Sequence, residues 1–297
     1  MAALAKYLIV LCAAVAASGH GLGPTDVEFH LFHRGSPTVS EPLLPTQNSL
    51  MQSSFSPFRP TVITIHNYGE KVFGNFNAFV VPAHLFAEDV NLIAIDWSAG
   101  SDLYSQGLAN AVECGERIAY FINFLAGLAG YGPENYRIVG VGLGGHIAGI
   151  AASHVLWGRI RHIVAIDPSL IGWTHNPHIL SAEKATVVEV LHGTAGVLGY
   201  DYPLGDLDFY PNGGTYQNGC GHDSSCSYIL SYAFYAESLT AVGGSQFVAT
   251  ACDSYEEAIF QTCSGDKGVV FGGIGDKTGL SGIYSFQTNF VPPFAQG

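Results

Sequence analysis

The sequence predicts an α/β fold in which a mostly parallel central sheet carries helices on both faces. Short apolar segments typical of buried strands alternate along the chain with segments of helical periodicity. One of these strands runs into a glycine-rich turn that opens a helix. The composition agrees, because 48% hydrophobic and 12% charged residues, with 37 glycines, are typical of a packed domain with many tight turns.

The expected elements follow one another in a regular order. Buried strands are predicted at 61–66, 91–97, 136–141, 160–166 and 186–192, helices at 108–129, 146–157 and 227–239, and terminal strands within 268–290. Residues 20–60 are rich in proline and serine and are expected to form an extended arm with short strands. Beyond Gly193 the pattern favours loops. Since the chain shows no repeat or linker, residues 20–297 are predicted to form a single domain.

Residues 1–19 have the pattern of a secretory signal peptide. Lys6 supplies a positive charge, Leu8–Ala17 is an unbroken apolar run, and the small residues Ser18 and Gly19 suit a cleavage site. This apolar run is too short to span a bilayer. The sequence therefore predicts a secreted, extracellular protein without a membrane anchor.

The chain carries a net charge of −13 at pH 7. An acidic surface repels phosphate backbones, so nucleic-acid binding is not expected. Asp206 and Asp208 stand close together but lack ligand-spaced partners, and a loop role is expected for them. The sequence thus predicts no metal and no cofactor.

Five cysteines follow the predicted signal peptide. In an oxidising compartment Cys220, Cys226, Cys252 and Cys263 can form two bridges, and the sequence permits three pairings. The local pairs Cys220–Cys226 and Cys252–Cys263 need the least rearrangement of the chain. Cys114 lies in a helical segment and is expected to be a buried free thiol, with an intermolecular bridge as the alternative.

The glycine-rich turn fits two unrelated chemistries. Gly140, Gly142 and Gly145 match G-x-G-x-x-G, the dinucleotide-binding fingerprint, and Asp167 stands at about the expected distance. That fingerprint normally opens its domain, however, and a secreted protein is an unusual place for a nicotinamide cofactor. Gly140, Gly142 and Gly144 also match the frame of the nucleophile elbow G-x-S-x-G, with glycine in the serine position. The elbow is the favoured interpretation.

Several segments together resemble the animal neutral lipase family, which includes pancreatic lipase, phospholipase A1 and the insect yolk proteins. The similar segments are Ile65–Tyr68 (the family's H-G-F/W turn), Asp89–Ser98, Arg137–Gly149 (the elbow and its helix), Ala165–Pro168 (the turn that carries the acid), and the loops His192–Tyr200 and Gly205–Gly214. The resemblance covers nearly the whole chain and implies an α/β-hydrolase fold.

Carried over residue by residue, the resemblance implies a damaged catalytic triad of an inactive, insect-like member. Gly142 stands at the nucleophile position, Asp167 retains the acid, and Tyr228 replaces the histidine base. A phenol, with a pKa of about 10, is a poor proton acceptor at neutral pH. The oxyanion donors would be the backbone amides of Tyr68 and Leu143, which need no particular side chain.

Other residues are not expected to replace the lost groups. His146, His192 and His222 are predicted to be loop or packing histidines, and Ser169 lies on the wrong strand for the elbow. Asp167 is expected to hold a neighbouring loop by accepting backbone hydrogen bonds.

The same resemblance bears on the cleft. The loop 221–225 between two cysteines is short and polar, whereas lid-bearing relatives have a long apolar loop there, so an open cleft is expected. No C-terminal β-sandwich is expected, and therefore no colipase as a partner.

The sequence thus predicts a secreted lipase-like pseudoenzyme. Its cleft would bind a lipid or another apolar small molecule, or the protein would serve as a storage or yolk-type component. The alternative is an active esterase, lipase or phospholipase A1 that hydrolyses carboxylic esters of lipids through displaced groups.

Overall fold

A computed structural model describes residues 21–23, 26–129, 131–241 and 243–297. The predicted signal peptide, residues 1–19, lies outside the described residues. Within them, eleven strands form one sheet in the order β10-β9-β11-β8-β7-β6-β5-β3-β4-β1-β2. The strands are β1 (Glu28–His33), β2 (Ser36–Leu43), β3 (Thr61–Ile65), β4 (Asn91–Asp96), β5 (Tyr136–Val141), β6 (His162–Ile166), β7 (Val187–Leu191), β8 (Leu207–Pro211), β9 (Val248–Cys252), β10 (Lys267–Val270) and β11 (Gly282–Phe286).

The centre of the sheet is parallel and its two edges are antiparallel. Every pairing from β4 through β3, β5, β6, β7 and β8 to β11 is parallel. The hairpin β1–β2 adds antiparallel strands beyond β4, and the hairpin β9–β10 does the same beyond β11. The prediction of a mostly parallel sheet is confirmed, and the carboxyl ends of the central strands meet at one edge, where ligand sites of such sheets lie.

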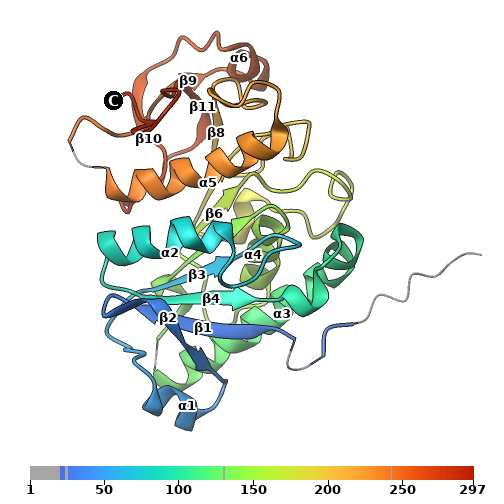
Figure 1. Cartoon of the computed structure of the whole chain (residues 1–297), viewed down its shortest axis with the longest axis vertical. Coiled ribbons are helices and arrows are strands. Elements are labelled where there is room, and N and C mark those ends of the chain that lie inside the picture. Colours follow the sequence, from blue (N-terminus) through green and yellow to red (C-terminus); the bar gives the residue numbers. More distant parts are fainter. Residues whose placement is uncertain (1–20, 24–25, 130, 242) are drawn as a thin grey trace, which may run out of the picture.

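Helices cover both faces of the sheet. They are α1 (Gln47–Gln52), α2 (Asn75–Ala87), α3 (Tyr104–Ala129), α4 (Leu143–Ser153), α5 (Ser224–Thr240) and α6 (Tyr255–Phe260). The pair α3 and α4 packs on one face, and α2 packs beside α5 on the other (Figure 1). This is the α/β-hydrolase fold that the resemblance implies.

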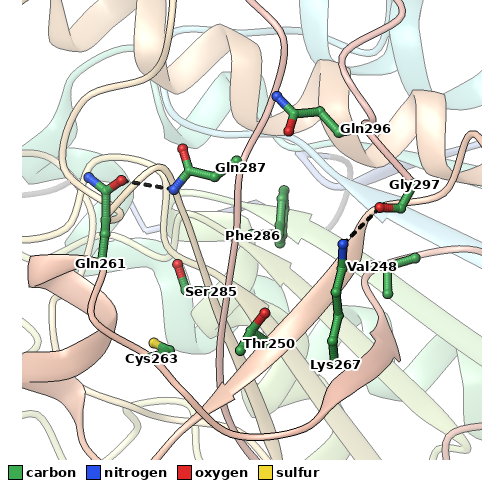
Figure 2. Close-up of a pocket in the computed structure, with 10 residues that line it drawn as sticks. All are labelled: Val248, Thr250, Gln261, Cys263, Lys267, Ser285, Phe286, Gln287, Gln296 and Gly297. Atoms are coloured by element: carbon green, nitrogen blue, oxygen red, sulfur yellow. Dashed lines mark hydrogen bonds between the residues drawn. The ribbon is translucent and has the colours of Figure 1, made fainter.

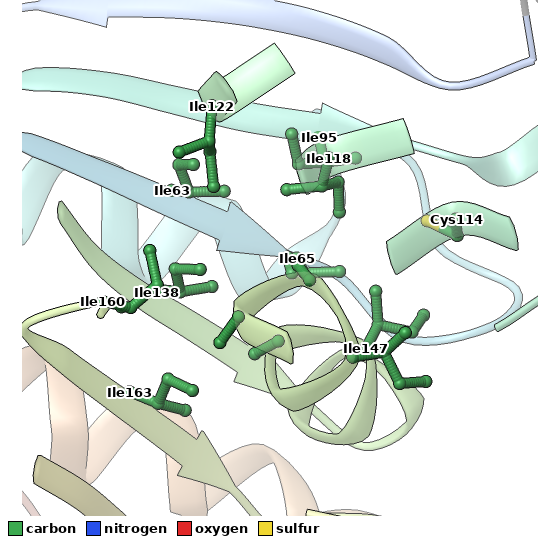
Figure 3. Close-up of a cluster of buried hydrophobic side chains, with 14 of the residues drawn as sticks. Ile63, Ile65, Ile95, Cys114, Ile118, Ile122, Ile138, Ile147, Ile160 and Ile163 are labelled. Atoms are coloured by element: carbon green, nitrogen blue, oxygen red, sulfur yellow. The ribbon is translucent and has the colours of Figure 1, made fainter. Parts of the chain in front are cut away.

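The core is divided by the sheet into two layers. Alternate residues of a strand point to opposite faces, so Ile63 and Ile138 pack toward α3 and α4 while Val62 and Val139 pack toward α2 and α5. Figure 3 shows the first layer, where isoleucines of the strands meet side chains of α3 and α4. Burial on both faces explains why these strands are apolar without alternation.

The predicted elements agree with the structure except at their ends, and the other differences are the unpredicted helix α2 and parts of the second half of the chain. The five predicted buried strands correspond to β3, β4, β5, β6 and β7. The helix predicted from residue 146 begins at Leu143, directly after the turn, and ends at Ser153. Strand β8 lies where loops were expected, and α2 was not predicted, because Pro82 within it is typical of a helix end.

Two disulfides join Cys220 to Cys226 and Cys252 to Cys263, which are the two local pairs. Cys114 on α3 is a buried free thiol in the core layer of Figure 3, and burial raises its pKa. It is therefore unreactive, and its burial argues against an intermolecular bridge. Among the described residues, no helix has the length and apolarity needed to cross a membrane.

A buried ion pair ties the C-terminal segment to the centre of the sheet. Glu189 on β7 pairs with Lys277, and both side chains are almost fully buried. The Glu189 carboxylate also accepts the N–H of Gly272 at 2.8 Å. Burial alone would raise the pKa of Glu189, but Lys277 and His162 together outweigh it and lower the pKa to about 2.

We expect Glu189→Gln to lower the free energy of unfolding by about 3–5 kcal/mol, because Lys277 would remain as an uncompensated buried charge. Chemical denaturation at pH 7 measures the change. Glu113→Gln is the matched control: Glu113 forms an exposed helical pair with Arg117, and its loss should cost less than about 1 kcal/mol. Equal effects of the two substitutions would contradict the assignment.

The ion pair of Glu189 and Lys277 should also make the free energy of unfolding depend on pH. The pKa of Glu189 is lower in the folded chain than its ordinary value of 4.5, so the ionised carboxylate stabilises the fold above that value. This contribution disappears as the pH falls from about 4.5 toward the folded pKa of about 2. The unfolding free energy of the unmodified chain should therefore fall more steeply over this window than that of Glu189→Gln.

Candidate functional site

The candidate site is built around the turn that joins β5 to α4. Gly142 is the single residue between them, with φ +59° and ψ −120°. Its N–H donates to the carbonyl oxygen of Ile166 at 3.1 Å, and its carbonyl oxygen accepts the N–H of Ser169 at 3.2 Å. A left-handed φ favours glycine, and the two bonds fix the turn against the end of β6.

The flanking glycines let the strand and the helix approach closely. A Cβ on Gly140 would overlap the carbonyl of Gly144, and one on Gly144 would overlap the carbonyl of Ile65 on β3. Both positions therefore require glycine for steric reasons alone. The frame G-x-G-x-G is thus retained by packing, whatever residue stands in its middle.

The side chain of Asn67 occupies the space above Gly142. Its Oδ1 accepts the N–H of Leu143 at 3.0 Å. A Cβ built on Gly142 would lie 2.5 Å from both Oδ1 and Nδ2 of Asn67. The side chain cannot move away without breaking the bond to Leu143, so this site cannot accept a serine as it stands.

The neighbourhood of Asn67 holds its backbone in place. His66 is buried, and its Nδ1 donates to the carbonyl oxygen of Asn67 at 2.6 Å while its Nε2 accepts the N–H of Trp97 at 3.3 Å. Asn67 itself is only 8% exposed. The residue is a fixed part of the site, and sequence reasoning missed it although it replaces the glycine of the family's H-G-F/W turn.

The two predicted oxyanion amides differ in their surroundings. The Leu143 amide is at the helix start, as expected, but Asn67 already accepts its hydrogen. Tyr68 lies at the rim of the adjoining cavity and is 40% exposed. The assignment of the two amides as oxyanion donors stays a prediction, and at Leu143 an oxyanion would have to displace the Asn67 side chain.

Tyr228, on α5, borders the same cavity as Asn67. Its hydroxyl is buried and has no hydrogen-bond partner among the described residues. Burial raises the pKa of Tyr228 well above its ordinary value, and the nearby carboxylates of Glu70 and Asp167 raise it further. A phenol held in its neutral form cannot act as a general base.

Asp167 is buried and accepts hydrogen bonds from the loop that follows β7. Its Oδ1 accepts the N–H groups of Gly193 and Thr194, each at 2.9 Å, and its Oδ2 accepts the Thr194 hydroxyl. Burial raises the pKa of Asp167, partly offset by these bonds. The carboxylate thus has the bracing role that the sequence suggested.

The other histidines are engaged elsewhere. His146 is buried, bonded to the carbonyl oxygen of Ser169 and stacked on Trp173, and burial lowers its pKa to about 3. His192 uses both ring nitrogens, on the Tyr200 carbonyl and on Asp208. His222 is exposed. None of the three lines the cavity beside Gly142.

Ser169 does line this cavity, on the segment after β6. Its backbone N–H bonds to Gly142, so it sits beside the turn and not at its tip. Asp206 and Asp208 accept backbone N–H groups of Val188 and of Leu204, each at 2.8 Å. These bonds give the two aspartates the loop role that was expected.

The contacts of the turn also bear on the dinucleotide interpretation. A pyrophosphate would need free amides at the start of α4, yet the Leu143 amide is bonded to Asn67. A ribose would need an accessible Asp167, which is 1% exposed. The Leu143 amide and the Asp167 carboxylate are thus unavailable to a dinucleotide. We therefore interpret the match to G-x-G-x-x-G as a coincidence of glycine spacing.

A cavity of about 540 Å³ opens beside the Gly142 turn. Its lining is mainly apolar and aromatic, with two acidic side chains. The lining residues are Asn67, Tyr68, Glu70, Asn75, Tyr104, Asp167, Ser169, Ile171, Leu198, Ser225, Tyr228, Ile229 and Tyr232. The volume lies within the range of small-molecule sites.

A second, smaller cavity lies at the far edge of the sheet. Figure 2 shows it between β9, β10 and β11, with a volume of about 240 Å³. Lys267 donates to the carbonyl oxygen of Gly297, and Gln287 donates to Gln261. It shares no lining residue with the cavity at Gly142.

Comparisons with known proteins agree with the family resemblance. A family model described as Lipase matches residues 8–269. Pancreatic triacylglycerol lipase of Cavia porcellus is 30% identical over 265 residues, which are 80% of this chain and 56% of that protein. The Homo sapiens protein of the same name is 29% identical over 269 residues, 81% of this chain and 57% of that one. The chain thus spans a little more than half the length of these relatives.

A double-mutant cycle tests whether Asn67 and Gly142 share one space. We expect Gly142→Ser to destabilise the unmodified chain more than it destabilises Asn67→Gly, by at least about 1 kcal/mol. The backbone strain of a serine at positive φ is present in both backgrounds and cancels. Chemical denaturation of the four proteins gives the coupling, and additive effects would show that the two positions are independent.

Proposed function

We propose that this chain, which belongs to the lipase family, is a non-catalytic member whose cavity binds an apolar ligand. The relatives are named as triacylglycerol lipases. This chain spans only part of their length, so their activity is not carried over with the family. The residues at the turn supply the support for the proposal.

The observation that carries the proposal is the position of the Asn67 side chain. In an acyl-transfer site the nucleophile needs open space above the turn, and the developing oxyanion needs free amides beside it. Asn67 fills the first and bonds to the second. Restoring the serine alone would leave both obstacles in place.

The absence of a base supports the same conclusion. Tyr228 stands at the histidine position that the resemblance assigns, and burial keeps its phenol neutral. Among the described residues, the cavity has no histidine in its lining. A nucleophile there would have no histidine to accept its proton.

The cavity favours ligand binding over a storage role. A storage protein needs no pocket, whereas this chain keeps one of about 540 Å³ next to the altered turn. Ile171, Leu198 and Ile229 give it an apolar wall. Buried apolar surface is the main source of affinity for a lipid-like molecule.

Secretion is part of the proposal. Two disulfides are present among the described residues, and such bonds persist in oxidising compartments. The apolar N-terminal run of the sequence supports a secretory signal.

The unmodified protein should not hydrolyse p-nitrophenyl butyrate above the buffer rate, and Asp167→Ala should not change that rate. A fluorophosphonate probe should label no serine. Hydrolysis well above buffer that Asp167→Ala abolishes, or specific serine labelling, would contradict a non-catalytic role and favour an active esterase.

Reconstruction should require three changes. We expect Asn67→Gly, Gly142→Ser and Tyr228→His together to give measurable hydrolysis of the same ester. Gly142→Ser with Tyr228→His alone should be about 10²-fold slower, because the loss of one oxyanion donor costs that much. Equal rates for the two proteins would show that Asn67 does not block the site.

Native mass spectrometry of protein from its source tests ligand binding. We expect a non-covalent adduct that disappears on denaturation. Ile229→Trp, which would fill the cavity from its apolar wall, is the control and should carry no adduct. Adduct-free protein from the native source would count against a carrier.

A further inference from the structure

The ionisable carboxyl groups in the lining of the cavity at Gly142 are not balanced by basic residues. Glu70 and Asp167 line it, and no lysine, arginine or histidine does among the described residues. Neither carboxylate takes part in an ion pair within the part of the chain that the structure describes. The wall is therefore acidic without internal compensation.

Glu70 accepts fewer hydrogen bonds than Asp167 does. One oxygen accepts the N–H of Phe76 at 3.3 Å, and the other is buried with no hydrogen-bond partner. Burial raises the pKa of Glu70. A buried, unpartnered carboxylate oxygen is costly, and a positive charge close by would relieve that cost.

Aromatic rings surround this acidic wall. Four tyrosines line the cavity, namely Tyr68, Tyr104, Tyr228 and Tyr232. They form two edge-to-face pairs: the ring centroids of Tyr68 and Tyr104 lie 5.1 Å apart, and those of Tyr228 and Tyr232 lie 6.0 Å apart. Tyrosine ring faces attract organic cations through their quadrupole.

From this combination we infer that the cavity selects an organic cation, an alkylammonium group on an apolar body, and excludes free fatty acid anions. The inference rests on the proposed ligand-binding function and specifies the head group. The apolar wall holds the body of such a ligand, and the tyrosines and the Glu70 carboxylate stabilise its charge. A fatty acid carboxylate would meet the acidic side chain of Glu70 and, among the described lining residues, no cation.

Three probes with the same ten-carbon chain distinguish the contribution of the head group to binding from that of the apolar body. Decyltrimethylammonium, 1-decanol and decanoate are titrated into the full chain by calorimetry at pH 7 and 0.15 M salt, where screening over about 8 Å suppresses distant surface charge. We expect the cation to bind at least tenfold more tightly than decanol, and decanoate to bind more weakly than decanol.

Variants assign the selectivity to the cavity. Glu70→Gln should weaken the cation about tenfold while decanol binding, which reports an intact cavity, changes less than twofold. Tyr68→Leu at the rim should also weaken the cation more than decanol. Glu256→Gln on α6 makes the same change of net charge outside the cavity and should alter neither.

The outcomes are distinguishable. Decanoate or decanol binding as tightly as the cation would overturn the charge selectivity and leave ligand binding intact. Cation binding that neither Glu70→Gln nor Tyr68→Leu weakens would overturn the assignment to this wall. Binding of none of the three probes would overturn the proposed ligand-binding function itself.

Discussion

The hydrogen bond from the Leu143 amide to the Asn67 side chain is the contact on which the account of the site depends. It satisfies an N–H at the first turn of α4 that the helix itself cannot satisfy. In the same step it places an amide group where a side chain at position 142 would stand. This one hydrogen bond thus stabilises the start of α4 and holds the Asn67 side chain in the space that a side chain at position 142 would need.

The residues around the turn that match the family pattern, Gly140, Gly144 and Asp167, each have a structural role. Gly140 and Gly144 are fixed by the close approach of β5, α4 and β3. Asp167 is fixed by three hydrogen bonds to the loop after β7. A family member that no longer needs a nucleophile would keep these residues for stability, which is why the family remains visible in its sequence.

Much of the fold could be predicted from the sequence, because burial on both faces gives strands such as β3 and β5 an unbroken apolar character. Strand β8 could not, since Asp208 interrupts its pattern, and that charge is stabilised inside the sheet by His192 and by the N–H groups of Leu204 and Gly205. The assignment of positions 142, 167 and 228 to a damaged triad comes from spacing and resemblance and stays a prediction. The role of Asn67 did not, because nothing in a linear sequence tells that the turn after β3 folds over the turn after β5.

Hydrogen exchange at the Leu143 amide, followed by NMR, tests the central claim most directly. In the unmodified protein this amide should exchange slowly, since Asn67 accepts its hydrogen. In Asn67→Gly it should exchange at least tenfold faster, while the Gly145 amide, which bonds to Gly142, stays protected. An unchanged exchange rate at Leu143 would contradict the account.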